Sequence, residues 1–245
     1  MPCVRTWGRI VGIVGAIGIG IGIGAGALAV DVGPVAAAPT RAASPAPVRY
    51  TVRAGDSFYG IASRFGIRAG ALAAANHLTL SSTLQPGQVL VVPGVQLPAN
   101  LPAHLPAPLL ANPDRLLLYP YFVAAAKESG VPADLLMATA YIESGWKQTA
   151  VSATGALGVG QLKPDTASWI AVVLMHKPGL DPANARDNIR MSAGFMRYLV
   201  DAHSGDLRRA LAAYYQGPGS VARDGVSSVG LVYAAKILAV RSSFT

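Results

Sequence analysis

A proline-rich segment near the middle of the sequence limits how this chain of 245 residues can fold. Between residues 94 and 112 the tripeptide Leu-Pro-Ala begins three times at a four-residue period, at Leu97, Leu101 and Leu105. A proline at every fourth position excludes a helix, and at about 3.1 Å per residue such an extended segment reaches roughly 60 Å. The sequence therefore predicts a semi-rigid linker over residues 94–112 with a folded domain on either side.

The composition excludes several classes of protein. Only 13% of the residues are charged and 52% are apolar, which argues against a disordered chain. The only cysteine, Cys3, excludes a disulfide framework, and the four histidines lack the spacing of metal ligands, so we expect no metal and no other cofactor. The net charge of +8 suits a polyanionic partner such as nucleic acid, anionic lipid or an acidic cell-wall polymer.

The N-terminal segment has the arrangement of charged, apolar and small residues that is typical of a secretion signal. Residues 10–30 carry no charge and follow two arginines, and the small residues Val35-Ala36-Ala37 come after them. The stretch is also long enough to span a bilayer, so an uncleaved membrane anchor is the alternative. Its seven glycines lower its hydrophobicity, which favours cleavage of a signal peptide over residues 1–37, followed by a linker over residues 38–49. Either outcome exports the rest of the chain.

The residues from 50 to 93 predict a small domain with the order strand, helix, helix, strand. An alternating strand begins at Tyr50 and stops at Gly55-Asp56, where Asp56 or Ser57 can cap the first helix. Apolar residues then recur at helical spacing until Gly66 ends that helix. The remaining predicted elements are a helix over residues 68–76 and a strand over residues 88–92.

The amino-acid sequence of this block resembles the LysM domain. The segments that carry the resemblance are YTVRAGDSFYGIASRFGI…LAAANHL…LQPGQVLVVP. The resemblance implies binding, without chemistry, to polymers that contain N-acetylglucosamine, such as peptidoglycan or chitin. It also implies that the turn at residues 80–82 and the loop formed by Gly55, Asp56, Ser57 and Phe58 line the sugar groove. The structural alternative for the same side chains is that Asp56 and Ser57 cap a helix and Phe58 lies in the core.

Only two glutamates occur in the whole sequence, and their surroundings differ. Glu128 lies at the end of a predicted helix over residues 121–129, where we expect a solvated carboxylate. Glu143 lies on a mostly apolar face in the last turn of a predicted helix over residues 132–144, ahead of the C-cap Gly145. Poor solvation and the helix macrodipole both raise the pKa of such a carboxyl. A carboxylic acid still protonated near neutral pH is what a glycosidic leaving group needs.

Five fragments of the C-terminal block occur in an order that resembles a known catalytic domain. They are Glu143-Ser144-Gly145, GALGVGQL at residues 155–162, Asp187-Asn188-Ile189, ALAAYYQGPG at residues 210–219, and Tyr233. This set resembles the lysozyme-like domain of soluble lytic transglycosylases. The resemblance implies an all-α fold with a deep cleft over residues 113–245. It further implies cleavage of the MurNAc-β-1,4-GlcNAc bond with formation of 1,6-anhydro-MurNAc.

The resemblance also assigns roles to residues. Glu143 would act first as general acid on the glycosidic oxygen and then as base toward the 6-hydroxyl of MurNAc. The N-acetyl group of the substrate can stabilise the cationic intermediate, so no second carboxylate is required. We expect Asp165 to be a first-turn residue of a helix and not a catalytic group. The substrate-binding residues that the resemblance implies are Ser144, Gln161, Tyr214 and Tyr233, with Tyr214 bonded to the acid.

Two positions depart from the pattern of that family. Gly160 stands where the family usually has methionine, and Tyr215 stands where it usually has asparagine. The first change would remove an apolar wall from the cleft, and the second adds an aromatic ring that could replace the wall or narrow a subsite. These departures bear on the preferred length of the substrate more than on the class of chemistry.

The sequence as a whole predicts a mostly α protein, with a lysozyme-like α-helical catalytic domain and a small N-terminal βααβ domain. We interpret it as an exported lytic transglycosylase that a LysM domain anchors to peptidoglycan, acting as a monomer and without nucleic acid. Three alternatives stay open. A goose-type-lysozyme-like hydrolase would need a second acid, which is not evident. A non-catalytic wall-binding protein would not need Glu143. A nucleic-acid binder would need clustered basic residues, and the basic residues here are scattered. Endo-action and exo-action are equally compatible with the sequence.

Overall fold

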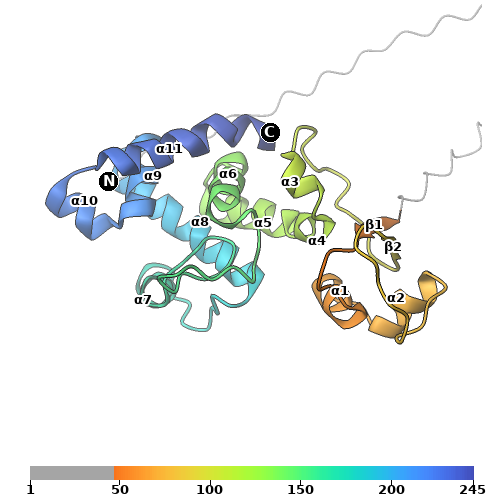
Figure 1. Cartoon of the computed structure of the whole chain (residues 1–245). Coiled ribbons are helices and arrows are strands. Elements are labelled where there is room, and N and C mark those ends of the chain that lie inside the picture. Colours follow the sequence, from red (N-terminus) through yellow and green to blue (C-terminus); the bar gives the residue numbers. More distant parts are fainter. Residues whose placement is uncertain (1–46) are drawn as a thin grey trace, which may run out of the picture. The chain divides into compact units, whose positions relative to one another are not determined.

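The computed structural model describes residues 47–245, so the predicted signal peptide or anchor over residues 1–37, and residues 38–46 of the first linker, lie outside the described residues. The described part is mostly helical and contains one two-stranded sheet near its N-terminal end (Figure 1). This confirms the predicted fold class, a mostly α chain with a small βααβ domain. Within residues 47–245, no helix combines the length and the apolar character needed to cross a membrane.

The βααβ domain has the element order that the sequence predicts. Strand β1 (Val48–Thr51) pairs antiparallel with β2 (Val89–Val92), and Tyr50 lies opposite Leu90. Helices α1 (Phe58–Phe65) and α2 (Ala69–Ala75) connect the two strands. The inward residues of both strands and the apolar faces of both helices form one core, in which Tyr50, Ile61, Leu72 and Leu90 are almost wholly buried. The first strand begins two residues before its predicted start.

The predicted linker over residues 94–112 does not remain extended along its whole length. A short helix, α3 (Ala107–Leu110), follows Pro106, and a second one, α4 (Pro113–Leu116), comes directly after the segment. Prolines are tolerated there because the first turn of a helix needs no N–H donors. Leu105 and Leu109 are 4% and 0% exposed and belong to the core of the helical domain. The prediction of a helix-free spacer was therefore wrong for its C-terminal part.

The helical domain is built around α6 (Ala133–Ser144). Residues 135–140 of this helix are all buried, which is expected for a helix that neighbours surround on every side. Those neighbours include α5, α8 and α11 (Figure 1), together with the C-terminal turn η2. The remaining elements are α5 (Tyr119–Ser129), α7 (Pro164–Trp169) with the π-helical turn η1 (Ile170–Leu174), α8 (Ala185–Ala202), α9 (Leu207–Gln216), α10 (Pro218–Asp224), α11 (Ser228–Val240) and η2 (Arg241–Phe244).

The C-terminal end of α6 is fixed by a glycine and a tryptophan. Gly145 adopts a left-handed conformation, with φ of 59°, and stops the helix. The next residue, Trp146, is fully buried, and its ring centroid lies 4.5 Å from that of Phe122 in α5 and 5.7 Å from that of Phe244 in η2. Its indole N–H donates to the carbonyl oxygen of Met137 at 2.9 Å. These contacts hold the last turn of α6, which carries Glu143, in one place.

Two adjacent leucines of α3 test whether this segment belongs to the core. Leu109 is buried, whereas Leu110 is 53% exposed. Leu109→Ala should lower the free energy of unfolding by about 2–4 kcal/mol, because it leaves a cavity, and Leu110→Ala should change it by less than about 0.5 kcal/mol. Urea denaturation of the three chains measures both values. Equally small effects at both positions would restore the linker interpretation for this segment.

Candidate active site

A cavity of about 450 Å³ lies beside the C-terminal end of α6. It brings together Glu143, Gln161 and Tyr214, three of the residues that the sequence assigned to the site. Glu143 is the only carboxylate among the described residues that line this cavity. Asp165, by contrast, lies exposed in the first turn of α7 and outside the cavity lining, as the sequence predicted.

The surroundings of Glu143 change its acidity. Burial raises the pKa of its carboxyl to about 7, and a hydrogen bond donated by the Tyr233 hydroxyl to Glu143 Oε1 opposes part of this rise. Tyr233 is itself almost fully buried, which raises the pKa of its own hydroxyl and keeps it a donor. A large fraction of Glu143 is therefore protonated at neutral pH and can deliver a proton to a bound molecule.

The tyrosine that bonds to the acid is not the one that the resemblance implied. The hydroxyl of Tyr214 donates to the carbonyl oxygen of Gly160 at 2.9 Å, and the bond to the acid comes from Tyr233 instead. Tyr214 lines the cavity, whereas Tyr233 is not part of the lining. The difference arises because α11, and not α9, brings its tyrosine hydroxyl to the carboxyl of α6.

Ser144 also has a structural partner. Its hydroxyl donates to the carbonyl oxygen of Val159 at 2.8 Å and accepts a bond from the backbone N–H of Lys147 at 3.1 Å. Ser144 does not line the cavity. It connects the end of α6 to the loop of residues 155–162. Its predicted role in binding substrate stays a prediction.

The loop of residues 155–162 is held by two amide side chains. Asn188 is fully buried; its Oδ1 accepts from the backbone N–H of Gly160 at 2.8 Å, and its Nδ2 donates to the carbonyl oxygen of Leu157 at 3.0 Å. Gln148 Oε1 accepts from the backbone N–H of Val159 at 3.2 Å. Sequence reasoning found Asn188 only as part of a motif and missed Gln148, for which no local signal exists.

Close packing explains the glycines of this loop. Gly158 has a φ of 73°, and a Cβ there would lie 2.6 Å from Asn188 Nδ2, so no other residue fits. A Cβ at Gly160 would lie 1.9 Å from the hydroxyl oxygen of Ser192 in α8. The same Cβ would lie 3.0 Å from the hydroxyl oxygen of Tyr214, which lines the cavity. The glycine thus lets Ser192 and Tyr214 approach the loop, and the effect of the missing methionine on the cleft stays a prediction.

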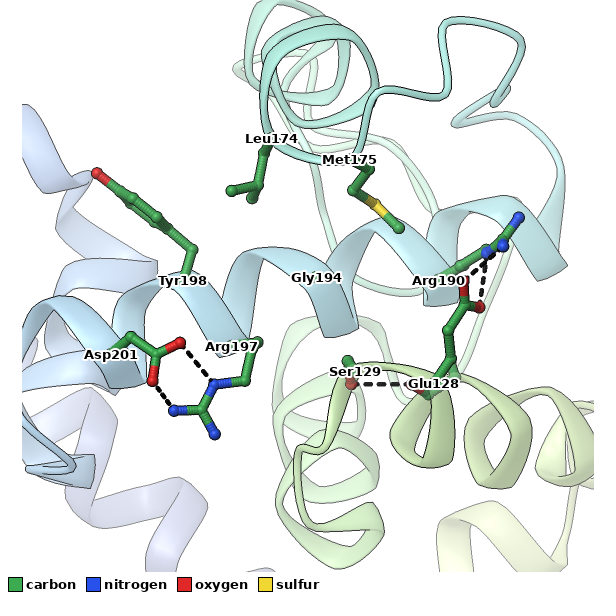
Figure 2. A pocket seen from close by; sticks show the side chains of 10 residues that line it. Glu128, Ser129, Leu174, Met175, Arg190, Gly194, Arg197, Tyr198 and Asp201 are labelled. Carbon is green, nitrogen blue, oxygen red and sulfur yellow. Dashed lines mark hydrogen bonds and ion pairs between the residues drawn. The ribbon is translucent and has the colours of Figure 1, made fainter. Parts of the chain in front are cut away.

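A second cavity, of about 340 Å³, lies between α5, α8 and η1 and shares no lining residue with the first. Figure 2 shows Glu128 facing Arg190 there. Arg190 Nε donates to Glu128 Oε2 at 2.7 Å and Lys177 Nζ donates to Oε1 at 2.8 Å, and these bonds hold the pKa of Glu128 at about 2. Glu128 is therefore an ion-paired carboxylate, not the freely solvated one that the sequence suggested, and it cannot serve as an acid near neutral pH.

Comparisons with known proteins match two separate parts of the described chain. A LysM domain model matches residues 50–93, and a transglycosylase SLT domain model matches residues 120–230. The chain carries a LysM domain followed by a transglycosylase SLT domain. Glu143, Gln161 and Tyr214 lie inside the SLT match, and Tyr233 lies just after it.

Individual relatives are similar over the SLT domain only. The peptidoglycan transglycosylase gp16 of Escherichia phage T7 is 37% identical over 98 residues, which are 40% of this chain and 7% of that protein. The membrane-bound lytic murein transglycosylase F of Thiobacillus denitrificans is 36% identical over 118 residues, which are 45% of this chain and 24% of that protein. A solved complex of the 70-kDa soluble lytic transglycosylase with bulgecin A is 22% identical, with a TM-score of 0.48, over 54% of this chain and 24% of that one. The chain thus spans less than a quarter of the length of each relative.

In the LysM domain, most side chains of the predicted sugar loop have structural partners. Ser57 caps α1 by accepting from the backbone N–H of Gly60 at 3.1 Å. Asp56 accepts from the Tyr50 hydroxyl at 2.7 Å and pairs with Arg64 at 3.0 Å. Phe58 is buried in the core, so its side chain is not available to a ligand. Glycan binding by this loop, including Gly55, stays a prediction that rests on backbone groups and on exposed Ser57.

The burial of Glu143 makes the stability of the SLT domain depend on pH. Its pKa is about 7 in the folded chain against an ordinary value of 4.5, so the stability present below pH 4.5 is lost as the pH rises through about 7. Glu143→Gln carries no charge to bury. The variant should match the wild type near pH 4 and exceed it at pH 8 by roughly 2–3 kcal/mol in the free energy of unfolding. Guanidinium denaturation at both pH values measures this, and a difference independent of pH would contradict the buried-acid assignment.

Proposed function

We propose that this chain is an exported peptidoglycan lytic transglycosylase. It cleaves the MurNAc-β-1,4-GlcNAc bond with formation of 1,6-anhydro-MurNAc, while its LysM domain holds it on the cell wall. The observation that carries the proposal is the environment of Glu143, a buried acid with a pKa of about 7 that is the sole carboxylate in the lining of its cavity. Export rests on the apolar residues 10–30 and on a substrate found outside the cytoplasm.

The reaction uses Glu143 twice. The protonated carboxyl gives its proton to the glycosidic oxygen, the bond from that oxygen to C1 of MurNAc breaks, and positive charge develops at C1. The resulting carboxylate accepts the hydrogen bond from Tyr233. It then removes the proton from the 6-hydroxyl of the same MurNAc while that oxygen bonds to C1. No water enters, and Glu143 ends the cycle protonated, as it began.

The absence of a second carboxylate from the cavity lining supports this reaction over hydrolysis. Glycosidases that use two carboxylates place them about 5–9.5 Å apart, one as acid and the other as nucleophile or base. Among the described residues that line the Glu143 cavity, no other carboxylate occurs. Capture by the substrate's own hydroxyl needs only one carboxyl group, which this cavity supplies.

The other lining residues suit a polar sugar polymer. Ser152, Thr154 and Thr166 contribute hydroxyl groups, and Gln161 contributes an amide whose Nε2 is fixed by the carbonyl oxygen of Gly158 at 2.9 Å. Lys163 is the only basic residue among the described residues that line the cavity. Its positive charge suits a cavity that takes an acidic cell-wall polymer.

Replacing the acid tests the reaction. Glu143→Gln keeps the shape of the side chain but cannot deliver a proton, so turnover of purified peptidoglycan should fall by about 10²–10⁴-fold. Glu128→Gln is the matched control, because it removes only partly exposed ion pairs, worth about 0–1 kcal/mol, in the other cavity. Mass spectrometry of the wild-type products should find 1,6-anhydro-MurNAc ends, each lighter by one water than a reducing end. Ordinary reducing ends would instead indicate a hydrolase. Loss of activity in the Glu128→Gln variant would contradict the assignment of Glu143 as the catalytic acid.

Removing the LysM domain separates wall binding from chemistry. A chain that lacks residues 48–93 should bind insoluble peptidoglycan more weakly, because the second binding module raises the local concentration of the enzyme on the wall. Its turnover of short soluble glycans should stay close to that of the full chain. Pull-down on insoluble sacculi and product release from soluble glycans measure the two effects, with thermal melting to check that the helical domain is folded. An equal loss of both would place the LysM domain in the catalytic site.

A further inference from the structure

Three aromatic residues line the cavity that holds Glu143, namely Phe195, Tyr214 and Tyr215, and Tyr215 is the exposed one. Tyr215, near the C-terminal end of α9, lines this cavity and is 54% exposed. Its ring lies on that of Tyr233, with the centroids 5.0 Å apart and 31° between the planes. One face of the Tyr215 ring is thus covered by the tyrosine that holds the acid, and much of the rest of the ring is open to solvent at the cavity.

The fold does not account for this exposed ring. The buried side of α9 is formed by residues 210–213, which pack into the domain without Tyr215. Within residues 47–245, the Tyr215 hydroxyl has no hydrogen-bonding partner, whereas those of Tyr214 and Tyr233 both have one. Exposed single aromatic residues are ordinary on surfaces, but this one forms part of the wall of a cavity that is otherwise rich in hydroxyl and amide groups.

We propose that Tyr215 is a stacking platform for a pyranose ring of the glycan, a specificity-determining residue at the cavity of Glu143. This inference rests on the proposed function. A β-linked N-acetylhexosamine with equatorial substituents has two faces formed by C–H groups and an edge of hydroxyl and amide groups. Stacking one face on Tyr215 removes apolar surface from water, while the polar edge stays free for groups such as Gln161.

The placement of the ring defines which sugars fit. Tyr215 contacts Tyr233, and Tyr233 is bonded to Glu143. The ring of Tyr215 therefore lies between a stacked sugar and the tyrosine that orients the acid. Sugars of the gluco configuration present a flat C–H face to such a ring. An axial hydroxyl on that face would keep the ring from close contact. Tyr215 therefore selects for gluco-configured units of the polymer near the scissile bond.

A binding experiment tests this without any turnover. The full chain with Glu143→Gln is titrated with a soluble tetramer of N-acetylglucosamine, and backbone amide shifts are followed at the end of α9 and, as an internal reference, in the LysM domain. Adding Tyr215→Ala should weaken binding at the α9 amides by roughly threefold to tenfold, the range of one aromatic contact. Adding Tyr215→Phe, which keeps the ring, should retain the affinity. Binding at the LysM amides should be the same in all three chains.

The outcomes separate this inference from the proposed function. An unchanged affinity at the α9 amides in the Tyr215→Ala chain, or an equal loss in the Tyr215→Phe chain, would overturn the stacking role and leave the proposed function standing. If the parent chain showed no saturable shift at α9 with this tetramer or with soluble peptidoglycan fragments, both would be overturned. In the chain that retains Glu143, Tyr215→Ala should raise KM without moving the pH at which kcat falls. A displaced pH profile would make Tyr215 a positioning residue for Tyr233 and not a sugar platform.

Discussion

The chemistry of this protein depends on the desolvation of one carboxyl group at the end of a buried helix. Residues 135–140 of helix α6 are all buried, and Gly145 and Trp146 fix the point at which the helix ends. Glu143 in the last turn is largely desolvated as well, although it lines the cavity. In that position the neutral acid is favoured over the carboxylate, and each unit of raised pKa corresponds to about 1.36 kcal/mol. The hydrogen bond from Tyr233 limits this rise and keeps the carboxylate accessible, as the second half of the proposed reaction requires.

The cavity wall formed by the loop of residues 155–162 is held in place by buried and partly buried polar groups. Asn188 and Gln148 bond to three backbone groups of the loop of residues 155–162, and Ser144 connects that loop to the end of α6. A buried amide such as that of Asn188 is stabilising only when its partners are in place, so these bonds give the loop one conformation. The acid and this wall of the cavity are therefore arranged before any substrate arrives, which is what a positioned proton transfer requires.

The sequence predicted those features whose cause is local. The strand and helix order of the LysM domain and the burial of Glu143 follow from residue spacing along single elements. The linker prediction failed at Leu105 and Leu109 because prolines that break a long helix are compatible with a helix of one turn, and because burial of leucines depends on what packs over them. The partner of Glu143 could not be predicted either, since the choice between Tyr214 and Tyr233 depends on where α9 and α11 place their tyrosine hydroxyls relative to the end of α6.

The two departures from the family pattern show that the effect of a substitution depends on what surrounds the side chain at that position. Gly160 and Tyr215 both belong to the motifs that resemble the SLT family, but a Cβ at position 160 would meet Ser192 of α8 and the hydroxyl of Tyr214, whereas Tyr215 itself lines the cavity. The small residue at 160 allows α8 and the hydroxyl of Tyr214 to approach the loop, and so it acts on the packing behind the wall. The ring at 215 adds an apolar surface where a sugar would lie. The preference for substrate should therefore follow the aromatic residue, while the glycine maintains the geometry that presents the acid.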